Sequence, residues 1–218
     1  MNRSLFRFLL LTIVCAAPLS VSRGEDSPKP VKPADEGKLL FDGKTLTNWK
    51  LSKFRGQGKV DVVEGALRLS EGKALTGVTW DGPALPKVDY EVTWEARRVE
   101  GTDFFCAVTF PVQDSSCSLV LGGWNGNITG LSSLDGADAS ENETSKHLDY
   151  EKGRWYKVRL KVTQEKIQAW LDDKVLADVE YKDRRVGIRI EVTPCEPFGF
   201  STYNTVGELR NIRHTVVK

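Results

Sequence analysis

VDYEVTWEA (88–96) alternates apolar and polar side chains without a break. One side of the extended chain would carry only apolar residues, namely Val88, Tyr90, Val92, Trp94 and Ala96. Strict period-two alternation is typical of a β-strand with one buried face and one solvated face. This stretch therefore predicts a sheet that packs one side against a core.

The same alternation recurs along most of the chain. It is clearest in WYKVRLKVT (155–163), and KIQAWLDDKVLADVEY (166–181) predicts a hairpin that turns at Asp172-Asp173. Further strands are predicted at 60–70 (a hairpin through Gly65), 104–110, 117–123, 128–134, 186–192, 198–203 and 207–217. No window of a dozen residues keeps helical spacing with caps. Short strands separated by regular turn signals predict an all-β sandwich or jelly roll.

The N-terminal residues 1–24 predict a secretory signal peptide. Arg3 and Arg7 precede an apolar run (8–17) that is too short to span a bilayer comfortably. Cys15 leaves lipidation open as an alternative. Residues 25–37 carry three prolines and alternating charge and predict a linker, whereas 38–218 predicts a single domain. We therefore expect a secreted or periplasmic protein with no membrane partner after cleavage.

The charge composition argues against nucleic acid as a partner. Lys and Arg number 31 and Asp and Glu 30, without a block of like charges. Proteins that bind nucleic acids carry a basic footprint, which this chain lacks.

Three cysteines follow the predicted signal peptide. Cys106 and Cys117 lie symmetrically about a turn near Val112-Gln113. In an oxidising compartment this symmetry predicts a cross-strand disulfide, with two separately buried thiols as the alternative. Cys195 is left over and is expected to fill space in the core.

The least regular segment is LGGWNGNITGLSSLDGADASENETSKHLDY (121–150). Glycines surround Trp124, and a long polar stretch with several acids follows. Long loops in compact domains are often functional. Carboxylates and amides can pair with sugar hydroxyls, while an indole stacks on the apolar face of a sugar. The segment predicts a carbohydrate site, with a merely solvated loop as the alternative.

Two groups of residues are candidates for that site. The candidate acids or bases are Asp135, Glu141 and Glu143. The candidate sugar-contacting residues are Trp124, Asn125, Asn142, His147 and Tyr203. The loop acids also suit calcium, although their spacing does not match an EF-hand. No zinc-ligand spacing, nucleophile elbow or phosphate loop occurs in the sequence, so no other cofactor is expected.

Three motifs resemble one known family. LFDGKTLTNW (40–49) resembles the opening motif of the 3-keto-disaccharide hydrolase domain family, Leu-Phe-Asp/Asn-Gly-Lys-x-Leu-x-x-Trp. GRWYKVRLKVTQEKIQAWLDDKVLAD (153–178) is similar to a later strand and hairpin of the family, and LRNIR (209–213) to its closing strand. The resemblance implies a concanavalin A-like jelly-roll sandwich of two antiparallel sheets. We expect the aromatics of the opening motif, Phe41 and Trp49, to be buried against the first and last strands.

The middle of the chain departs from the family pattern. Members carry Tyr-Glu-x-Gln-Ile-x-Asp on the concave face, where TGLSSLD (129–135) keeps only Asp135. STYNT (201–205) stands in place of Gln-Asp-His-Gly near the C-terminus. Two functions stay open. The family name favours an exported glycoside hydrolase, and the missing polar residues favour a non-catalytic glycan-binding module on the same face. A third, less favoured hypothesis is a protein-interaction module.

Overall fold

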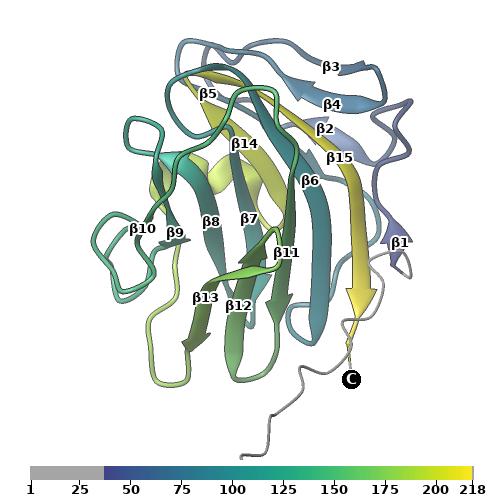
Figure 1. Ribbon diagram of the computed structural model, residues 1–218. Helices are drawn as coiled ribbons and strands as arrows, with labels where there is room; N and C mark the ends of the chain where they lie inside the picture. Colours follow the sequence, from purple (N-terminus) through teal and green to yellow (C-terminus); the bar gives the residue numbers. More distant parts are fainter. Residues whose placement is uncertain (1–36, 218) are drawn as a thin grey trace, which may run out of the picture. The chain divides into compact units, whose positions relative to one another are not determined.

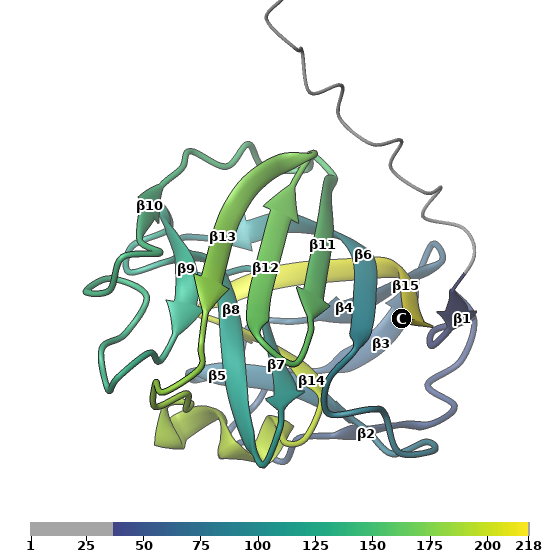
Figure 2. The ribbon, with the colours of Figure 1, turned by 90° about the horizontal axis from the view of Figure 1, so that it is seen from below.

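The computed structural model describes residues 37–217, which form two antiparallel sheets packed face to face (Figures 1 and 2). Sheet A runs in the spatial order β13 (Lys174–Glu180), β12 (Lys166–Leu171), β11 (Tyr156–Val162), β6 (Tyr90–Gly101), β15 (Thr205–Val216), β4 (Ala66–Leu69) and β3 (Val60–Val63), with β1 (Lys38–Leu39) also paired to β15. Sheet B runs in the order β10 (Lys146–His147), β9 (Ile128–Ser132), β8 (Ser115–Gly123), β7 (Cys106–Val112), β14 (Gly199–Tyr203), β5 (Leu75–Trp80) and β2 (Trp49–Leu51). The expected all-β jelly-roll sandwich is confirmed.

The core lies between the two sheets and follows the alternation of the strands. In β6, Tyr90, Val92 and Trp94 point inward and are at most 1% exposed. In sheet B, Phe110 of β7 and Leu119 of β8 meet them from the other side and are fully buried. Burying one face of each sheet supplies the main favourable free energy of such a sandwich.

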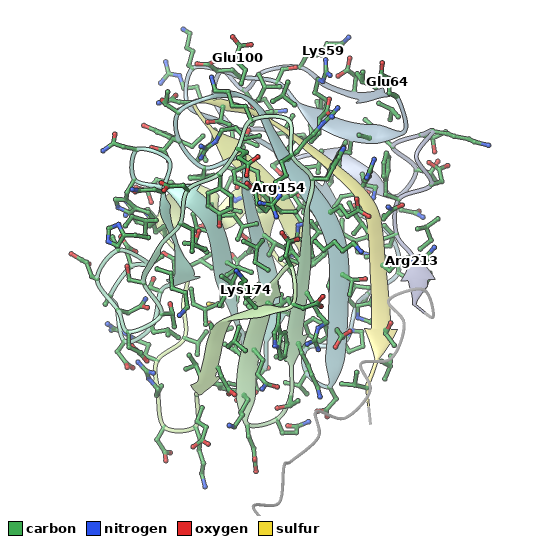
Figure 3. The ribbon with its side chains drawn as sticks, in the orientation of Figure 1. Lys59, Glu64, Glu100, Arg154, Lys174 and Arg213 are labelled. Carbon is green, nitrogen blue, oxygen red and sulfur yellow. The ribbon has the colours of Figure 1, made fainter. Side chains whose placement is uncertain are left out.

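Charged residues gather where the chain meets solvent. Figure 3 shows Lys59, Glu64 and Glu100 pointing outward at the end of the domain that carries the β3–β4 hairpin. Among residues 37–217, no helix has the length and apolar content needed to cross a membrane.

The opening motif passes from one sheet to the other. β1 pairs with β15 in sheet A, whereas β2 pairs with β5 in sheet B. The predicted burial of Phe41 and Trp49 is confirmed, at 3% and 6% exposure. The Trp49 ring packs on Trp80 of β5, with centroids 5.2 Å apart, and on Phe200 of β14. Its neighbours are therefore β5 and β14 rather than the last strand.

The predicted strand 186–192 is wrong. This segment crosses the outer face of sheet B and ends in a 3₁₀ helix, η1 (Ile190–Cys195), which Figure 2 shows outside the sheet. Thr79 of β5 donates its hydroxyl to the carbonyl oxygen of Pro194 at 2.7 Å. The same cover explains why β5 was not predicted. Both faces of β5 are buried, so its sequence, LTGVTW, has no charged residue and no solvated face.

The predicted disulfide between Cys106 and Cys117 is not formed, and both are buried free thiols. The β7–β8 hairpin turns at Gln113-Asp114, because Val112 pairs with Ser115. That register places Cys106 opposite Leu121 and Cys117 opposite Phe110. The turn lies later than the symmetry of the cysteines requires, so the two sulfurs are not cross-strand partners.

The predicted signal peptide, Cys15 and the predicted linker up to residue 36 lie outside the described residues.

Candidate functional site

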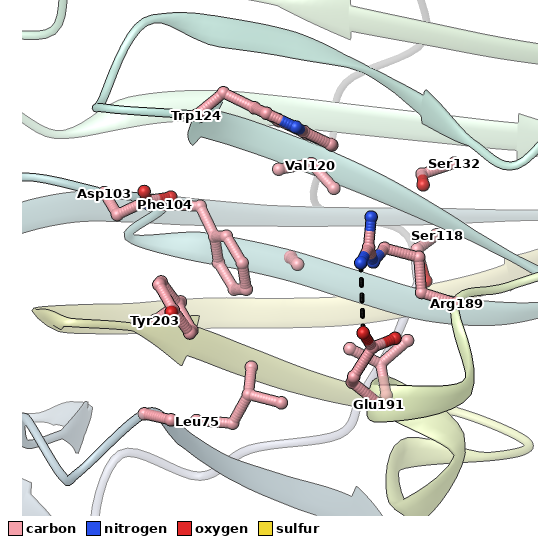
Figure 4. A pocket seen from close by; sticks show the side chains of 13 residues that line it. Leu75, Asp103, Phe104, Ser118, Val120, Trp124, Ser132, Arg189, Glu191 and Tyr203 are labelled. Atoms are coloured by element: carbon pink, nitrogen blue, oxygen red, sulfur yellow. Dashed lines mark hydrogen bonds and ion pairs between the residues drawn. The ribbon is translucent and has the colours of Figure 1, made fainter. Parts of the chain in front are cut away.

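A groove of about 410 Å³ opens on the outer face of sheet B (Figure 4). Its floor consists of the outward-facing residues of three adjacent strands, Ala107 of β7, Ser118 and Val120 of β8, and Ser132 of β9. These side chains alternate with large core residues that point the other way. Because the floor residues are small, the sheet leaves room for a ligand above it.

Three aromatic side chains line one side of the groove. Trp124 comes from the β8–β9 turn, Phe104 from the connection between β6 and β7, and Tyr203 from the end of β14. The rings of Phe104 and Tyr203 are stacked, with centroids 5.8 Å apart and planes at 27°. Tyr203 is 36% exposed and Trp124 is partly exposed. We call these three residues the aromatic wall.

Asp103 connects two parts of the aromatic wall. Its Oδ1 accepts the backbone N–H of Phe104 at 2.8 Å, and its Oδ2 accepts that of Asn125 at 3.2 Å. The turn that presents Trp124 is tight, because Trp124 and Asn125 both have positive φ, 49° and 69°. The Asp103 carboxylate therefore holds Phe104 and the Trp124 turn against each other.

The opposite side of the groove is charged. Arg189 donates from Nη2 to Glu191 Oε1 at 3.0 Å and pairs through Nη1 with Asp138. Asp138 also accepts a hydrogen bond from Ser132 Oγ at 3.1 Å. The hydrogen bond from Arg189 lowers the pKa of Glu191, so this carboxyl stays ionised. Figure 4 shows the Arg189–Glu191 pair facing the groove across from the aromatic wall.

The chain matches the 3-keto-alpha-glucoside-1,2-lyase-like domain family over residues 36–215. It belongs to that family. No curated protein matches the chain.

Solved structures with the same fold as this 3-keto-alpha-glucoside-1,2-lyase-like domain share little sequence with it. A candidate glycosyl hydrolase from Parabacteroides distasonis has 15% identity and a TM-score of 0.55, over 84% of this chain and 95% of the other. The carbohydrate-binding module CBM66 from Bacillus subtilis has 10% identity and a TM-score of 0.52, over 77% and 94%. The Emp46p carbohydrate recognition domain has 16% identity and a TM-score of 0.55, over 83% and 94%. At these identities the likeness shows the fold alone.

Two of the predicted acids lie away from the groove of this family member. Asp135 and Glu143 both pair with Arg184, and Asp135 also accepts the backbone N–H of Arg185 at 2.9 Å. The bond from Arg185, followed by that from Arg184, lowers the pKa of Asp135, and Arg184 lowers the pKa of Glu143. Neither residue lines the groove. Both carboxylates stay ionised at neutral pH and form ion pairs with Arg184.

Other predicted residues stabilise or flank the loop. Asn142 is 9% exposed, and its Nδ2 donates to three backbone carbonyls, those of Leu131, Ala137 and Asp138. Its Oδ1 accepts from Thr144, so its amide is committed to the shape of the loop.

Three further predicted residues are exposed. Glu141 lies on the loop surface, and His147 lies on β10. Asn125 lies next to Trp124 on the turn. Of all the predicted site residues, only Trp124 and Tyr203 line the groove.

Sequence reasoning missed Phe104, Asp103, Arg189 and Glu191. Phe104 and Phe105 are consecutive, and in an alternating strand two neighbours cannot both face the core. That break in alternation was the available signal for Phe104, since Phe105 is fully buried and Phe104 faces the groove. Arg189 and Glu191 were missed because the segment 186–192 was wrongly predicted to be a strand.

The loop acids do not fit a calcium site as they are arranged. Arg184 pairs with both Asp135 and Glu143, and Arg189 pairs with Asp138. The carboxylate oxygens that would bind calcium are therefore paired with arginine side chains. Within residues 37–217 no group of three or more His, Cys, Asp or Glu side chains is placed to hold a metal ion.

A second hollow, of about 540 Å³, lies between the turns at 113–115 and 181–186. Its lining is rich in charged and amide side chains, such as Gln113, Lys182 and Asp183. The aromatic residue in its lining, Tyr181, is only 4% exposed and donates its hydroxyl to Thr163. This hollow lacks the exposed aromatic surface that distinguishes the groove.

Proposed function

We propose that this domain binds a carbohydrate in the groove on sheet B, without hydrolysing it. A pyranose ring has an apolar face that stacks on aromatic rings and a rim of hydroxyls that pair with carboxylates. The groove offers the aromatic wall for stacking on the apolar face and the carboxylate of Asp103 for pairing with the hydroxyls. Its volume is in the range of small-molecule sites in proteins.

One observation carries this proposal: Trp124, Phe104 and Tyr203 come from three separate segments and meet on one side of the groove. Partly exposed aromatics contribute little to the core, and an exposed apolar cluster rimmed by polar residues marks a ligand-binding groove. Their convergence above a floor of small residues is accounted for by a ligand with a flat apolar face. The family and the carbohydrate-binding structures of the same fold support the same class of ligand.

The acids favour binding over hydrolysis. Glycoside hydrolysis needs a general acid whose pKa is raised, so that it still carries a proton near neutral pH. The pKa values of Asp135, Glu143 and Glu191 are instead lowered by hydrogen bonds from arginine or backbone N–H groups. None of the three is therefore prepared to protonate a leaving group.

A glycoside-cleaving enzyme is the second candidate. It is favoured by the family and by the presence of two carboxyl groups in the groove, Asp103 from the aromatic side and Glu191 from η1. In that case, substituting either Asp103→Asn or Glu191→Gln would abolish turnover.

We further propose that the domain acts after export, since the N-terminal pattern predicts a signal peptide.

The experiment is titration calorimetry of the purified domain with four probes: methyl α-glucoside, methyl 3-keto-α-glucoside, maltotriose and cellotriose. We expect at least one to bind, and Trp124→Ala to weaken it by about tenfold, the value of one aromatic stacking contact. Trp170→Ala is the matched control. That indole lies on sheet A and is covered by the guanidinium of Arg159, 3.5 Å from its ring centroid.

Turnover of the same probes is followed by chromatography. Binding without products supports the module, and products that disappear in Asp103→Asn or Glu191→Gln decide for the enzyme. Failure of all four probes to bind, or equal loss in Trp124→Ala and Trp170→Ala, overturns the assignment of the groove.

A further inference from the structure

Arg98 occupies a core position that the alternation of β6 reserves for an apolar side chain. It follows Tyr90, Val92, Trp94 and Ala96 on the inward face and is 7% exposed. Burying a guanidinium is costly unless its hydrogen bonds are satisfied, and an arginine does not escape this cost by losing its proton. Burial lowers the pKa of Arg98, which agrees with the poor solvation of the charge. Such a residue at this position needs an explanation.

The side-chain hydrogen bonds of Arg98 in the described part of the chain all come from Nη2 and go to backbone carbonyls, whereas its buried Nε has no partner there. Its Nη2 donates to the oxygens of Asp103 at 3.1 Å, Gly122 at 3.2 Å and Gly126 at 2.8 Å. The guanidinium also lies over the buried rings of Phe105 and Tyr150, 5.2 Å and 5.8 Å from their centroids. These contacts join the segment before β7 to the β8–β9 turn.

Two glycines, Gly122 at the end of β8 and Gly126 in the turn that follows, permit this approach. A Cβ at Gly122 would lie 2.6 Å from Arg98 Nη2. A Cβ at Gly126 would lie 2.6 Å from the carbonyl oxygen of Thr102 and 3.3 Å from Arg98 Nη2. Both glycines have positive φ, +71° and +101°. The glycines around Trp124 therefore bring the backbone of the turn against the guanidinium.

The segments that Arg98 joins are those that carry the aromatic wall. Gly122 and Gly126 bracket Trp124, and Asp103 precedes Phe104. Tyr203 is coupled to the same place, because its backbone N–H donates to the carbonyl oxygen of Phe104 at 3.1 Å. The arginine lies beneath the wall without lining the groove.

We propose that Arg98 is the positioning residue of the groove: its guanidinium sets the separation of Trp124 and Phe104 and so holds the aromatic wall in its ligand-binding arrangement. The role in binding rests on the proposed function of the groove, whereas the coupling between the two segments does not. A guanidinium is suited to this task because its Nη2 reaches carbonyls from both segments while its plane packs on the rings of Phe105 and Tyr150. An apolar residue would fill the space without connecting them.

The first test needs no sugar. Amide hydrogen exchange is measured on the full chain and on Arg98→Met, Arg98→Lys and the control Arg159→Met. The control removes an arginine from sheet A that pairs with Glu91 and stacks on Trp170. We expect exchange in 102–105 and 122–127 to rise about tenfold or more in Arg98→Met, through local opening, and less in Arg98→Lys. Unchanged exchange in both segments overturns the proposal.

The second test measures affinity for whichever of the four probes the parent binds best. We expect about a tenfold loss in Arg98→Met, partial recovery in Arg98→Lys, and no loss in Arg159→Met, since one stacking contact is worth that much. Arg98→Met should still fold but with a lower urea midpoint than the parent, because the carbonyl oxygens of Gly122 and Gly126 lose their donor. Looser segments with unchanged affinity would overturn the role in binding.

Two outcomes separate this inference from the proposed function. If the parent binds none of the probes, the proposed function fails, and the exchange experiment alone decides whether Arg98 holds the segments. If Arg98→Met does not fold, Gly126→Ala tests the contact from the side of the turn and should raise exchange in the same two segments. Normal exchange in Gly126→Ala would contradict the proposal.

Discussion

The indole N–H of Trp49 donates a hydrogen bond to the carbonyl oxygen of Leu40 at 2.9 Å, and both residues are buried. Leu40 directly follows β1 of sheet A, and Trp49 begins β2 of sheet B. The bond therefore joins the two ends of the segment that passes between the sheets. Asp42 shapes the turn within it, because its Oδ1 accepts the backbone N–H groups of Lys44 and Thr45 at 2.8 Å.

Trp49→Ala should lower the free energy of unfolding by roughly 3–5 kcal/mol, the usual loss for a large core aromatic. The substitution removes the contacts with Trp80 and Phe200 as well as the bond to Leu40. Urea titration measures the change, and Trp170→Ala on the outer face of sheet A should cost about 1 kcal/mol or less. A Trp49→Ala variant with the stability of the parent would show that the packing of Trp49 contributes nothing to stability.

Stability should fall as the pH is lowered below 6.5, because of His214. This residue is 6% exposed and stacks on Tyr90, with ring centroids 5.4 Å apart. Burial, with a smaller contribution from Lys38, lowers the pKa of His214 below its ordinary value of 6.5. A group whose folded pKa is lower than its unfolded pKa stabilises the fold above 6.5, and this contribution is lost as the pH falls through the folded pKa.

Urea midpoints measured at pH values above and below 6.5 test the prediction for His214. His214→Phe keeps a ring against Tyr90 and should flatten the dependence, whereas His147→Asn, on exposed β10, should not. An unchanged pH dependence in His214→Phe would assign the effect to other groups.

The cysteines should react with a thiol reagent only after unfolding. Burial raises the pKa of Cys106 and of Cys117 to about 12, so neither forms a thiolate at neutral pH. Cys195 is fully buried as well. Peptide mapping under non-reducing conditions should recover all three as free thiols. Detection of a peptide that links Cys106 to Cys117 would contradict the observed register.

Asp135→Asn and Glu143→Gln should leave carbohydrate affinity unchanged. Both side chains pair with Arg184 and neither lines the groove. Calorimetry with the probe that binds the parent measures this, with Trp124→Ala as the variant that should lose binding. Loss of binding or of turnover in Asp135→Asn would return this acid to the functional site.

Much of the fold was predictable because it depends on neighbouring residues. The hairpin at Asp172-Asp173 follows from two residues that tolerate positive φ, here 46° and 65°, between alternating strands. The hairpin through Gly65 follows from the same reasoning. The strand predicted at 186–192 failed because alternation indicates which side chains share a face but not whether a partner strand is available. Ile190, which it placed in a sheet, is 84% exposed.

The sequence by itself determined the all-β class and the position of most strands, since periodicity and turn chemistry are local, and the resemblance of its opening motif indicated the burial of Phe41 and Trp49. Only the tertiary structure decided the groove. Its aromatic wall joins Phe104, Trp124 and Tyr203, which meet because β8, β7 and β14 are neighbours in sheet B. That order is set by long-range strand pairing, which local patterns do not encode. The acids of the loop were visible in the sequence, but their partners Arg184 and Arg189 reach them only through the fold.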